Sequence, residues 1–340
     1  MSRSVRWVRS LDALLLRIRR ALLPPEMVVF EDSTAPWLAS ALGTACYLGL
    51  PDQVSDSGSS LPELSRQTGV EVERLARLLR VLISHGYFRF GTDSRVCHNR
   101  LSRGLSEGKA GAFCRLQAES WYRDCFAADR VSEALRDQQI PFEHSFGRGF
   151  FDKPPEPHRQ LFSQAMAEIS RFCAPHIAAA MAFGPGDRVL DVGGGNGQLC
   201  RALARRFPGV EFAVLDLEEH PDQEGVTHLQ GSFFEELPGR FDHLILKNVL
   251  HDWDDSQALR ILENCAAASC RLSVVELLLP EQLEAAGAGP DFAVDWNVYC
   301  TLGGRERTLP EYTDLLEKAG WRLLRATPTA TPLQVLSCQR

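Results

Sequence analysis

The 340-residue sequence contains no Cys-x-x-Cys pair and no continuous apolar run long enough to cross a bilayer. A transmembrane helix needs about 18 such residues, so no segment is expected to span a membrane. Ten cysteines, spread from Cys46 to Cys338, fit neither a zinc pattern nor the disulfide framework of a small secreted domain. We therefore expect reduced thiols, no metal centre and a cytoplasmic location.

The sequence also has no excess of basic residues. Its net charge of -7 and isoelectric point near 5.8 argue against a general nucleic-acid binder. The exception is residues 1–23, which carry six arginines and one acidic residue. A basic amphipathic helix could touch a membrane surface, but packing on a partner subunit is the favoured interpretation, so no stable membrane association is expected.

The first third of the chain predicts a small helical domain. Apolar spacing indicates helices over 36–50, 61–68 and 71–85, and two short strands follow at 87–90 and 95–98. Helix, turn, helix and hairpin form a winged helix, a fold that often binds DNA. The net charge of residues 61–110 is only +4. We therefore interpret residues 1–110 as a mostly α winged-helix dimerisation domain.

Residues 111–182 are predicted to be a helical linker that walls an acceptor pocket. Breaks are expected around 146–150 and at the prolines of 154–157. A helix over 158–172 places Phe162 and Met166 on one face, as four-residue spacing does in a helix. Ordinary core packing and a pocket wall explain this pair equally well.

The most informative stretch is RVLDVGGGNG, residues 188–197. It indicates a buried strand over 188–192, a turn with glycines at 193, 194, 195 and 197, and a helix over 198–207. This order binds nucleotide-like ligands at the carboxyl end of a first strand. The G-x-G-x-G spacing differs from the G-x-G-x-x-G of dinucleotide folds. Asp191 precedes the glycines, and Asp216 ends the next strand, where a carboxylate can bind a ribose diol.

The remaining sequence alternates strands and helices. Strands are predicted over 227–230, 241–246 and 272–277, and helices over 256–268 and 309–319. This pattern predicts an α/β fold with a mostly parallel sheet covered on both faces. The last two strands, 321–327 and 333–338, are joined by a loop too short for a parallel crossover, so they must be antiparallel. Residues 183–340 thus have the order expected of class I methyltransferases.

Two stretches after predicted strands, 231–234 and 247–253, and one before the last long helix, 301–308, offer chemical groups. In 231–234 an aromatic ring can cover an adenine beside a side-chain oxygen. His251 follows a central strand and, with an ordinary pKa near 6.5, supplies some neutral base at pH 7. Glu276, Glu306 or Asp252 could hold its tautomer. Two alternatives stay open: the aspartates near His251 cap the next helix, or, less well supported, they bind a metal with it.

These motifs resemble those of the S-adenosylmethionine-dependent O-methyltransferases related to caffeate, hydroxyindole and bacterial polyketide methyltransferases. The resemblance covers nearly the whole chain and is strongest in DVGGGNG (191–197), LDL (215–217), LKNVLHDWDD (246–255), VVELLLPE (274–281) and GGRERT (303–308). It implies a winged-helix dimerisation domain, a Rossmann-like domain and intertwined homodimers. It also implies S-adenosylmethionine as the cofactor and a small aromatic acceptor.

The resemblance assigns roles to residues of this sequence. Asp191, Gly193, Gly195, Asp216, Leu217, Ser232, Phe233 and Lys247 would bind the cofactor. Phe162, Met166, Trp253 and Asn297 would line the acceptor pocket. His251 would be the general base, flanked by Glu276, Glu306 and Asp252. The sequence departs from the family pattern in two places. Ser232 stands where the family often has Asp, and the segment 150–161, around its prolines, is shorter than the family pattern leads one to expect.

Methyl transfer to a hydroxyl of an aromatic natural product is therefore the leading hypothesis. One alternative is a non-methylating enzyme on the same scaffold, such as a hydroxylase, decarboxylase or cyclase, because fold does not fix function. Another is a winged-helix regulator that senses the cofactor.

Overall fold

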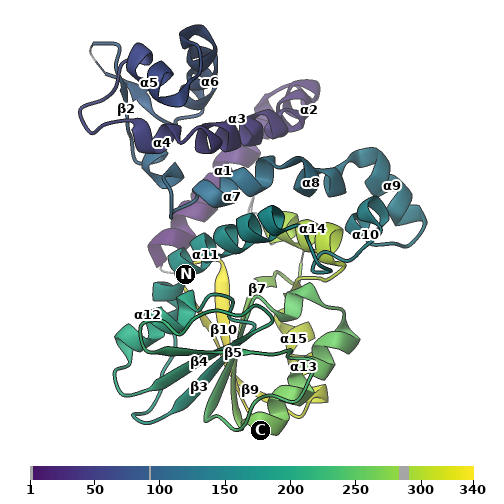
Figure 1. Cartoon of the computed structure of the whole chain (residues 1–340). Coiled ribbons are helices and arrows are strands. Elements are labelled where there is room, and N and C mark those ends of the chain that lie inside the picture. The colour runs from purple at the N-terminus through teal and green to yellow at the C-terminus, as the bar shows by residue number, and fades with distance from the viewer. Residues whose placement is uncertain (1–2, 92, 283–290) are drawn as a thin grey trace. The chain divides into compact units, whose positions relative to one another are not determined.

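The structure is a computed structural model that describes residues 3–91, 93–282 and 291–340 (Figure 1). The chain divides into two compact units. The sheet unit comprises Met1–Arg19, Cys125–Asp152 and Cys173–Arg340, and the helical unit comprises Arg20–Asp124 and Lys153–Phe172. The domain boundaries predicted near residues 110 and 182 stay predictions.

The helical unit has the predicted order of helices and hairpin. Its elements are α2 (Pro25–Ser33), α3 (Ala35–Tyr47), α4 (Leu50–Gln53), α5 (Leu61–Thr68), α6 (Val72–Ser84), β1 (Arg89–Phe90), β2 (Val96–Cys97), η1 (Ser102–Leu105), α7 (Gly111–Ala118) and α8 (Ser120–Arg123). A capping box between Ser60 and Glu63 begins α5. Leu75, Leu79 and Leu82, one face of α6, are fully buried, so the periodicity of the sequence identified the core.

One helix boundary in this unit was predicted wrongly. The expected helix over 36–50, ended by Pro51, is two helices: α3 ends at Tyr47 and α4 begins at Leu50. Gly49 between them has φ +61°, a left-handed conformation that glycine adopts without strain. Pro51 lies in the first turn of α4, where its missing N–H costs nothing.

The chain then forms further helices, of which the one predicted over 158–172 is longer than expected. They are η2 (Asp124–Phe126), α9 (Ala128–Arg136), α10 (Pro141–Phe146) and α11 (Glu156–Ala178). The predicted breaks near 146–150 and 154–157 are present, because α10 ends at Phe146 and α11 begins at Glu156. At the N-terminus, α1 (Arg3–Leu22) forms the expected helix, of which residues 1–2 lie outside the described part.

The sheet unit contains one sheet with strand order β5-β4-β3-β6-β7-β10-β9, and β8 pairs with β7. The strands are β3 (Arg188–Val192), β4 (Glu211–Asp216), β5 (Val226–Gln230), β6 (His243–Lys247), β7 (Arg271–Leu279), β8 (Arg307–Thr308), β9 (Arg322–Pro328) and β10 (Leu333–Gln339). The path from β5 to β7 is parallel, and β10 is antiparallel to both β7 and β9. The predicted α/β fold with an antiparallel final hairpin is confirmed.

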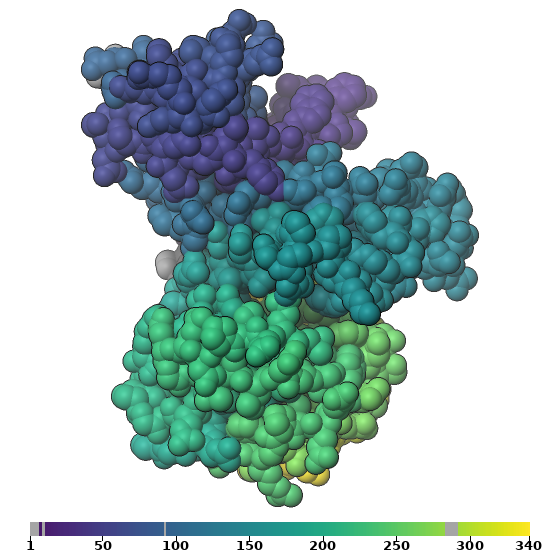
Figure 2. Space-filling model, in the orientation of Figure 1, coloured from purple at the N-terminus to yellow at the C-terminus, as the bar shows by residue number. Residues whose placement is uncertain are grey.

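Helices cover both faces of the sheet. The helices that follow β3 in sequence are α12 (Gln198–Arg206), η3 (Leu250–Asp252), α13 (Asp255–Ala268), α14 (Asp291–Leu302) and α15 (Leu309–Lys318). Figure 1 shows α12 on one side of the strands and α13 and α15 on the other. Figure 2 shows the outer surface of the molecule, and every β6 residue from His243 to Leu246 is buried beneath such a surface. Apolar strands of this kind are typical of parallel sheets covered on both sides.

The topology gathers several strand ends at one edge. Because β3, β4, β6 and β7 are parallel, their carboxyl ends meet there, and the strand order reverses between β3 and β6. Open α/β sheets bind ligands at this switch point. Lys247, the last residue of β6, pairs with Val275, so β7 continues beyond β6 from Glu276 to Leu279. This overhang brings Glu276 to the edge although it lies inside a strand.

Candidate active site

The glycine turn after β3 is closely packed at one end and open at another. Gly193, Gly195 and Gly197 have φ of +75°, +55° and +76°, which side chains rarely adopt. A Cβ on Gly193 would lie 2.9 Å from Val249 Cγ2 and 3.4 Å from Phe233 Cε1. A Cβ on Gly195 would meet nothing within 4 Å. The turn therefore rests on neighbouring side chains while the backbone around Gly195 can be approached by a ligand.

Asp216 lies against this turn at the end of β4. Its Oδ2 accepts a hydrogen bond from the N–H of Gly195 at 2.8 Å, and its Oδ1 accepts one from the N–H of Glu218 at 3.2 Å. Each carboxylate oxygen has a second lone pair, so two further donors can still bind. Leu217, the next residue, is 61% exposed. The structure thus brings Asp216, which the sequence predicts to bind a ribose diol, next to the glycine turn.

Asp191 is a buried carboxylate at the same edge. Its Oδ1 has no hydrogen-bond partner among the described residues, and the thiol of Cys200 is 3.9 Å from its Oδ2. Burial raises the pKa of Asp191 to about 7, although the positive charge of Lys247 opposes the shift. A buried acceptor without a donor fits a cationic or hydrogen-bonding ligand at this edge.

The candidate adenine residues lie in an aromatic cluster. The ring of Phe233 lies 5.9 Å from that of Trp253 at 76°, and Phe234 contacts Trp253 at 4.7 Å and 87°. Ser232 Oγ accepts a hydrogen bond from the N–H of Phe234 at 3.2 Å. The structure thus brings Ser232, Phe233 and Trp253 together, next to Gly193.

His251 lies in η3, directly after β6, and faces three carboxylates. Its Nδ1 is 2.7 Å from Glu306 Oε1 and 3.8 Å from Glu276 Oε2, and its Nε2 is 3.2 Å from Asp252 Oδ1. His251, Glu276 and Glu306 are all buried. Residues separated by up to 55 positions in sequence therefore form one cluster, as the sequence predicted.

The charges of this cluster change its protonation. Burial alone would lower the pKa of His251, but Glu276, Asp252 and Glu306 outweigh it and raise that pKa to about 10. Burial raises the pKa of Glu276 to about 7 and that of Asp252 to about 6, although His251 opposes both shifts. The neutral imidazole expected from an ordinary pKa is therefore a minor form at pH 7. The imidazole is mostly protonated because three carboxylates lie close to it, and their distances cannot be read from the sequence.

The open alternatives for His251 can be compared with this geometry. Asp254 caps α13, since its Oδ1 accepts the N–H of Gln257 at 2.8 Å, whereas Asp252 faces His251. Glu276 Oε1 accepts the N–H groups of Val249 and Leu250, each at 3.0 Å. Possible ligand atoms of His251, Glu276 and Glu306 lie within 4.8 Å of one another. Each of these side chains makes a hydrogen bond, whereas Glu276 Oε2 and Glu306 Oε2 have no hydrogen-bond partner among the described residues, and the absence of a metal stays a prediction.

The remaining predicted pocket residues fall in both units. Asn297 lies on α14, which packs against β7 and η3 in the sheet unit. Phe162 and Met166 lie on the part of α11 that belongs to the helical unit, where both are half-buried. Their role in the acceptor pocket stays a prediction.

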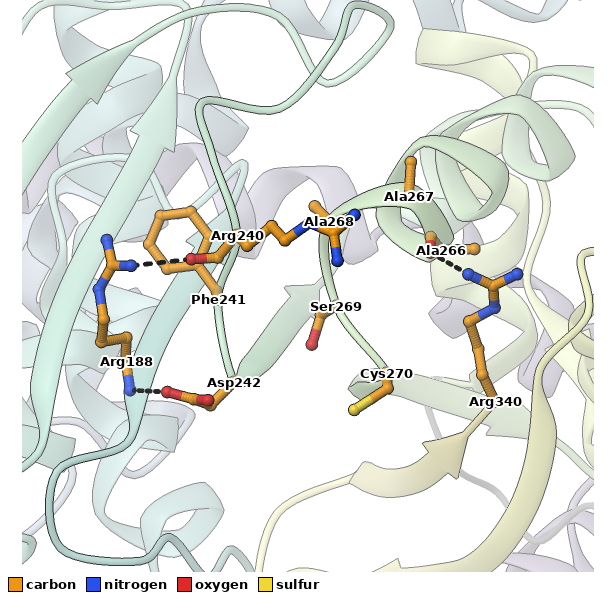
Figure 3. A pocket seen from close by; sticks show the side chains of 10 residues that line it. All are labelled: Arg188, Arg240, Phe241, Asp242, Ala266, Ala267, Ala268, Ser269, Cys270 and Arg340. Atoms are coloured by element: carbon orange, nitrogen blue, oxygen red, sulfur yellow. Dashed lines mark hydrogen bonds between the residues drawn. The ribbon is translucent and has the colours of Figure 1, made fainter.

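A pocket of about 450 Å³ lies at the opposite edge of the sheet. Figure 3 shows Arg188 at the start of β3, Asp242 before β6, and Arg340 after β10 around it. Arg188 Nη1 donates to the carbonyl of Arg240 at 3.0 Å. Because this pocket faces the amino ends of the parallel strands, it is separate from the His251 cluster.

Two residues at the site were quoted in a motif but given no role. Arg307 is 1% exposed, and its guanidinium donates to the carbonyls of Leu250 and Trp253, each at 2.9 Å. A Cβ on Gly304 would lie 2.0 Å from the carbonyl oxygen of His251. No local sequence pattern marks Arg307, because its partners are more than 50 positions away in sequence.

Comparison with known proteins identifies the family. The profile of the O-methyltransferase domain matches residues 127–322, and that of the O-methyltransferase dimerisation domain matches residues 33–105. The chain belongs to the O-methyltransferase family. The enzyme uses S-adenosylmethionine, and its dimerisation domain supports a homodimer.

Relatives of this O-methyltransferase act in natural-product biosynthesis. It is 32% identical over 327 residues to the mitomycin biosynthesis 6-O-methyltransferase of Streptomyces lavendulae, covering 89% of this chain and 91% of the relative. It is 30% identical to the phenazine O-methyltransferase PhzM of Lysobacter antibioticus, covering 94% and 98%. The solved structure of LaPhzM matches with a TM-score of 0.83 at 29% identity, covering 93% of this chain and 99% of that one.

One solved relative was crystallised with both of its small molecules. NcsB1, from neocarzinostatin biosynthesis, was solved with S-adenosylmethionine and 2-hydroxy-5-methyl naphthoic acid, and matches with a TM-score of 0.67 at 25% identity, covering 88% of this chain and 95% of that one.

Within residues 3–91, 93–282 and 291–340, no helix of the methyltransferase is both long and apolar enough to span a membrane.

Proposed function

We propose that the enzyme methylates a hydroxyl group of a small aromatic natural product, with His251 as the general base. The observation that carries the proposal is the 2.7 Å contact between His251 Nδ1 and Glu306 at the carboxyl edge of the sheet. The names of the bacterial relatives support an aromatic acceptor such as a phenol.

The cofactor residues suit S-adenosylmethionine. The carboxylate of Asp216 has lone pairs available for the ribose hydroxyls, and Ser232 and Phe233 can contact the adenine. The backbone at Gly195 is open, and Asp191 offers an unpaired buried oxygen beside Lys247. The cofactor supplies an electrophilic methyl carbon on a sulfonium, so the chain must mainly align the acceptor and remove its proton.

His251 can perform the proton transfer through Nε2. A phenol has an ordinary pKa near 10 and becomes a good nucleophile only as its proton leaves. Nδ1–H is held by Glu306, which fixes the tautomer and stabilises the imidazolium that forms. Nε2 must first lose its own proton to solvent, because the carboxylate of Asp252, 3.2 Å away with a pKa of about 6, is a weaker base than an imidazole with a pKa of about 10. Nε2 would then accept the hydroxyl proton, so that the acceptor oxygen could take the methyl group that the cofactor would supply.

The test is transfer of a labelled methyl group to a panel of phenols by wild type and His251→Gln. Loss of a general base should lower kcat by about 10²–10⁴-fold. His243→Gln is the matched control, because His243 is buried at the other end of β6, where its Nε2 is 2.8 Å from Ser273 Oγ. Equal activity in wild type and His251→Gln would contradict the role of the base.

The methyl-transfer assay and a DNA-binding assay together separate the alternatives. A hydroxylase, decarboxylase or cyclase would consume the acceptor without incorporating the labelled methyl group. A regulator that senses the cofactor would shift a labelled DNA duplex at physiological salt, whereas an enzyme of small molecules should leave it unmoved. The homodimer is tested by sedimentation, and the cytoplasmic location stays a prediction.

A further inference from the structure

Arg307 lies beside the His251 cluster and is only 1% exposed. Its guanidinium donates to Leu250 O and Trp253 O at 2.9 Å each, and to Asp255 Oδ1 at 2.8 and 3.0 Å. These acceptors bracket His251 and Asp252 on both sides. One rigid planar group therefore holds both ends of the short loop that carries the base.

The residues before Arg307 hold the centre of the same loop. The N–H of Arg305 donates to the carbonyl of His251 at 2.8 Å. Gly304 lies so close that a Cβ would be 2.0 Å from that carbonyl oxygen. Between these contacts and Arg307 is Glu306, whose Oε1 is 2.7 Å from His251 Nδ1. The segment 304–307 therefore fixes the loop and carries the carboxylate that binds the imidazole.

We propose that Arg307 is a positioning residue that fixes the 250–253 loop in register with Glu306, so that His251 Nδ1 stays on the carboxylate. The inference rests on the proposed function of His251 as the base. Arg307 touches neither ring nitrogen and acts only through the loop. A lysine cannot replace it, because one ammonium group cannot reach three acceptors spread over residues 250–255 in a planar fork.

The charged groups that face His251 determine the sign of the expected change. They are Glu306, Glu276 on β7 and Asp252 on η3, while Lys247 at the end of β6 acts on Asp252. The three carboxylates raise the pKa of His251, and burial lowers it. If Arg307→Lys lets the loop move away from Glu306, the pKa of His251 must fall, because burial remains and the hydrogen bond weakens.

The first measurement is therefore a titration of the His251 ring by NMR in histidine-labelled protein. Its signal is identified by its absence in His251→Gln. Loss of a charge-assisted hydrogen bond should raise the acid dissociation constant at least about tenfold in Arg307→Lys. A merely structural arginine would change stability and leave this constant alone. An unchanged constant would overturn the proposal.

A matched control uses a second structural arginine of the same unit. Arg271 donates to Asp242 O and to Asp187 Oδ1, each at 2.9 Å, at the opposite edge of the sheet. Arg271→Lys should lower the melting temperature without moving the His251 titration. If both variants shift it equally, general loosening rather than positioning is responsible, and the proposal fails.

Kinetics provide the second measurement. A displacement of about 1 Å in a reacting group can cost about 10²-fold in rate. Arg307→Lys should therefore lower kcat by about that factor while the KM for S-adenosylmethionine stays unchanged.

If Arg307→Lys does not fold, Asp255→Asn takes its place. The Asp255 side chain is 64% exposed, and the hydrogen bonds of Arg307 to the two carbonyl groups remain in this variant. A smaller shift in the same direction is expected, and none would count against the proposal.

The two proposals can fail separately. If no phenol is methylated, the NMR titration still reports whether Arg307 holds His251 on Glu306. If methyl transfer requires His251 but the acid dissociation constant of His251 is unchanged in Arg307→Lys, the proposed function stands and the positioning role of Arg307 is wrong.

Discussion

Glu306→Gln is the most direct test of how the carboxylates control His251. The glutamine keeps an acceptor oxygen at 2.7 Å from Nδ1 but removes the negative charge. A hydrogen bond to a charged group contributes about 1.5–3 kcal/mol, which is about one to two pH units in a pKa. The pKa of His251, about 10 in the native chain, should therefore fall towards about 8–9 in the variant.

The assay is the pH dependence of kcat for one phenol, measured in both proteins. Only neutral His251 accepts a proton, so the rate should rise with pH and level off above the pKa of the complex. The variant should level off at a lower pH because its imidazolium is less stable. Its plateau should also be lower, since a weaker base removes the proton less well. Using one acceptor cancels the ionisation of the phenol itself.

Glu263→Gln provides the control, because Glu263 is an exposed residue of α13 and undergoes the same chemical change. Its profile should match that of the native enzyme. An inflection that stays in place in Glu306→Gln, or moves to higher pH, would refute the electrostatic reasoning. A lower rate with an unmoved inflection would leave Glu306 as a steric support only.

Three further changes test the cofactor edge. Asp216→Ala should weaken S-adenosylhomocysteine binding by about 1.5–3 kcal/mol in calorimetric titration, and an unchanged affinity would place the ribose elsewhere. Asp191→Asn should stabilise the ligand-free protein above pH 7. The pKa of Asp191 is about 7 in the folded protein and 3.8 in the unfolded chain, so the native protein loses stability as pH rises between these values. The loss, which the asparagine variant avoids, is at most about 4 kcal/mol. Denaturation at pH 5 and pH 8 checks it, and an equal difference at both would count against it. Gly193→Ala should lower stability by about 1–2 kcal/mol because of its φ of +75° and its contact with Val249, and a thermal melt like that of wild type would be inconsistent with the packed turn.

The sequence predicted most of the sheet because its strands carry strong local signals. Three of the five residues 188–192 are apolar and glycines follow them, and the structure has β3 over that range. The antiparallel final hairpin followed from a loop too short for a crossover. Pro51 was misread because a proline can either end one helix or occupy the first turn of the next, and only the left-handed Gly49 decides between them.

The side chains that the structure brings together around His251 could be named from the sequence, but their protonation could not. His251, Glu276 and Glu306 could be named from their motifs, yet the role of Glu276 depends on how far β7 extends past β6. Arg307 was missed because its acceptors lie at residues 250–255, and no local pattern joins the two segments. The protonation of His251 depends on three distances that only the folded chain defines.

The arrangement of charge at the carboxyl edge also suits a cationic cofactor. Asp191, Asp216, Asp252, Glu276 and Glu306 all lie around the ends of β3, β4, β6 and β7, with Lys247 and a protonated His251 as the cations among them. The carboxylates exceed the cations, and several are buried where charge is weakly screened. A sulfonium and an ammonium group bring positive charge into such an edge favourably. The same charge would disfavour an imidazolium nearby, so cofactor binding should lower the pKa of His251 and enlarge the fraction of base available to the acceptor.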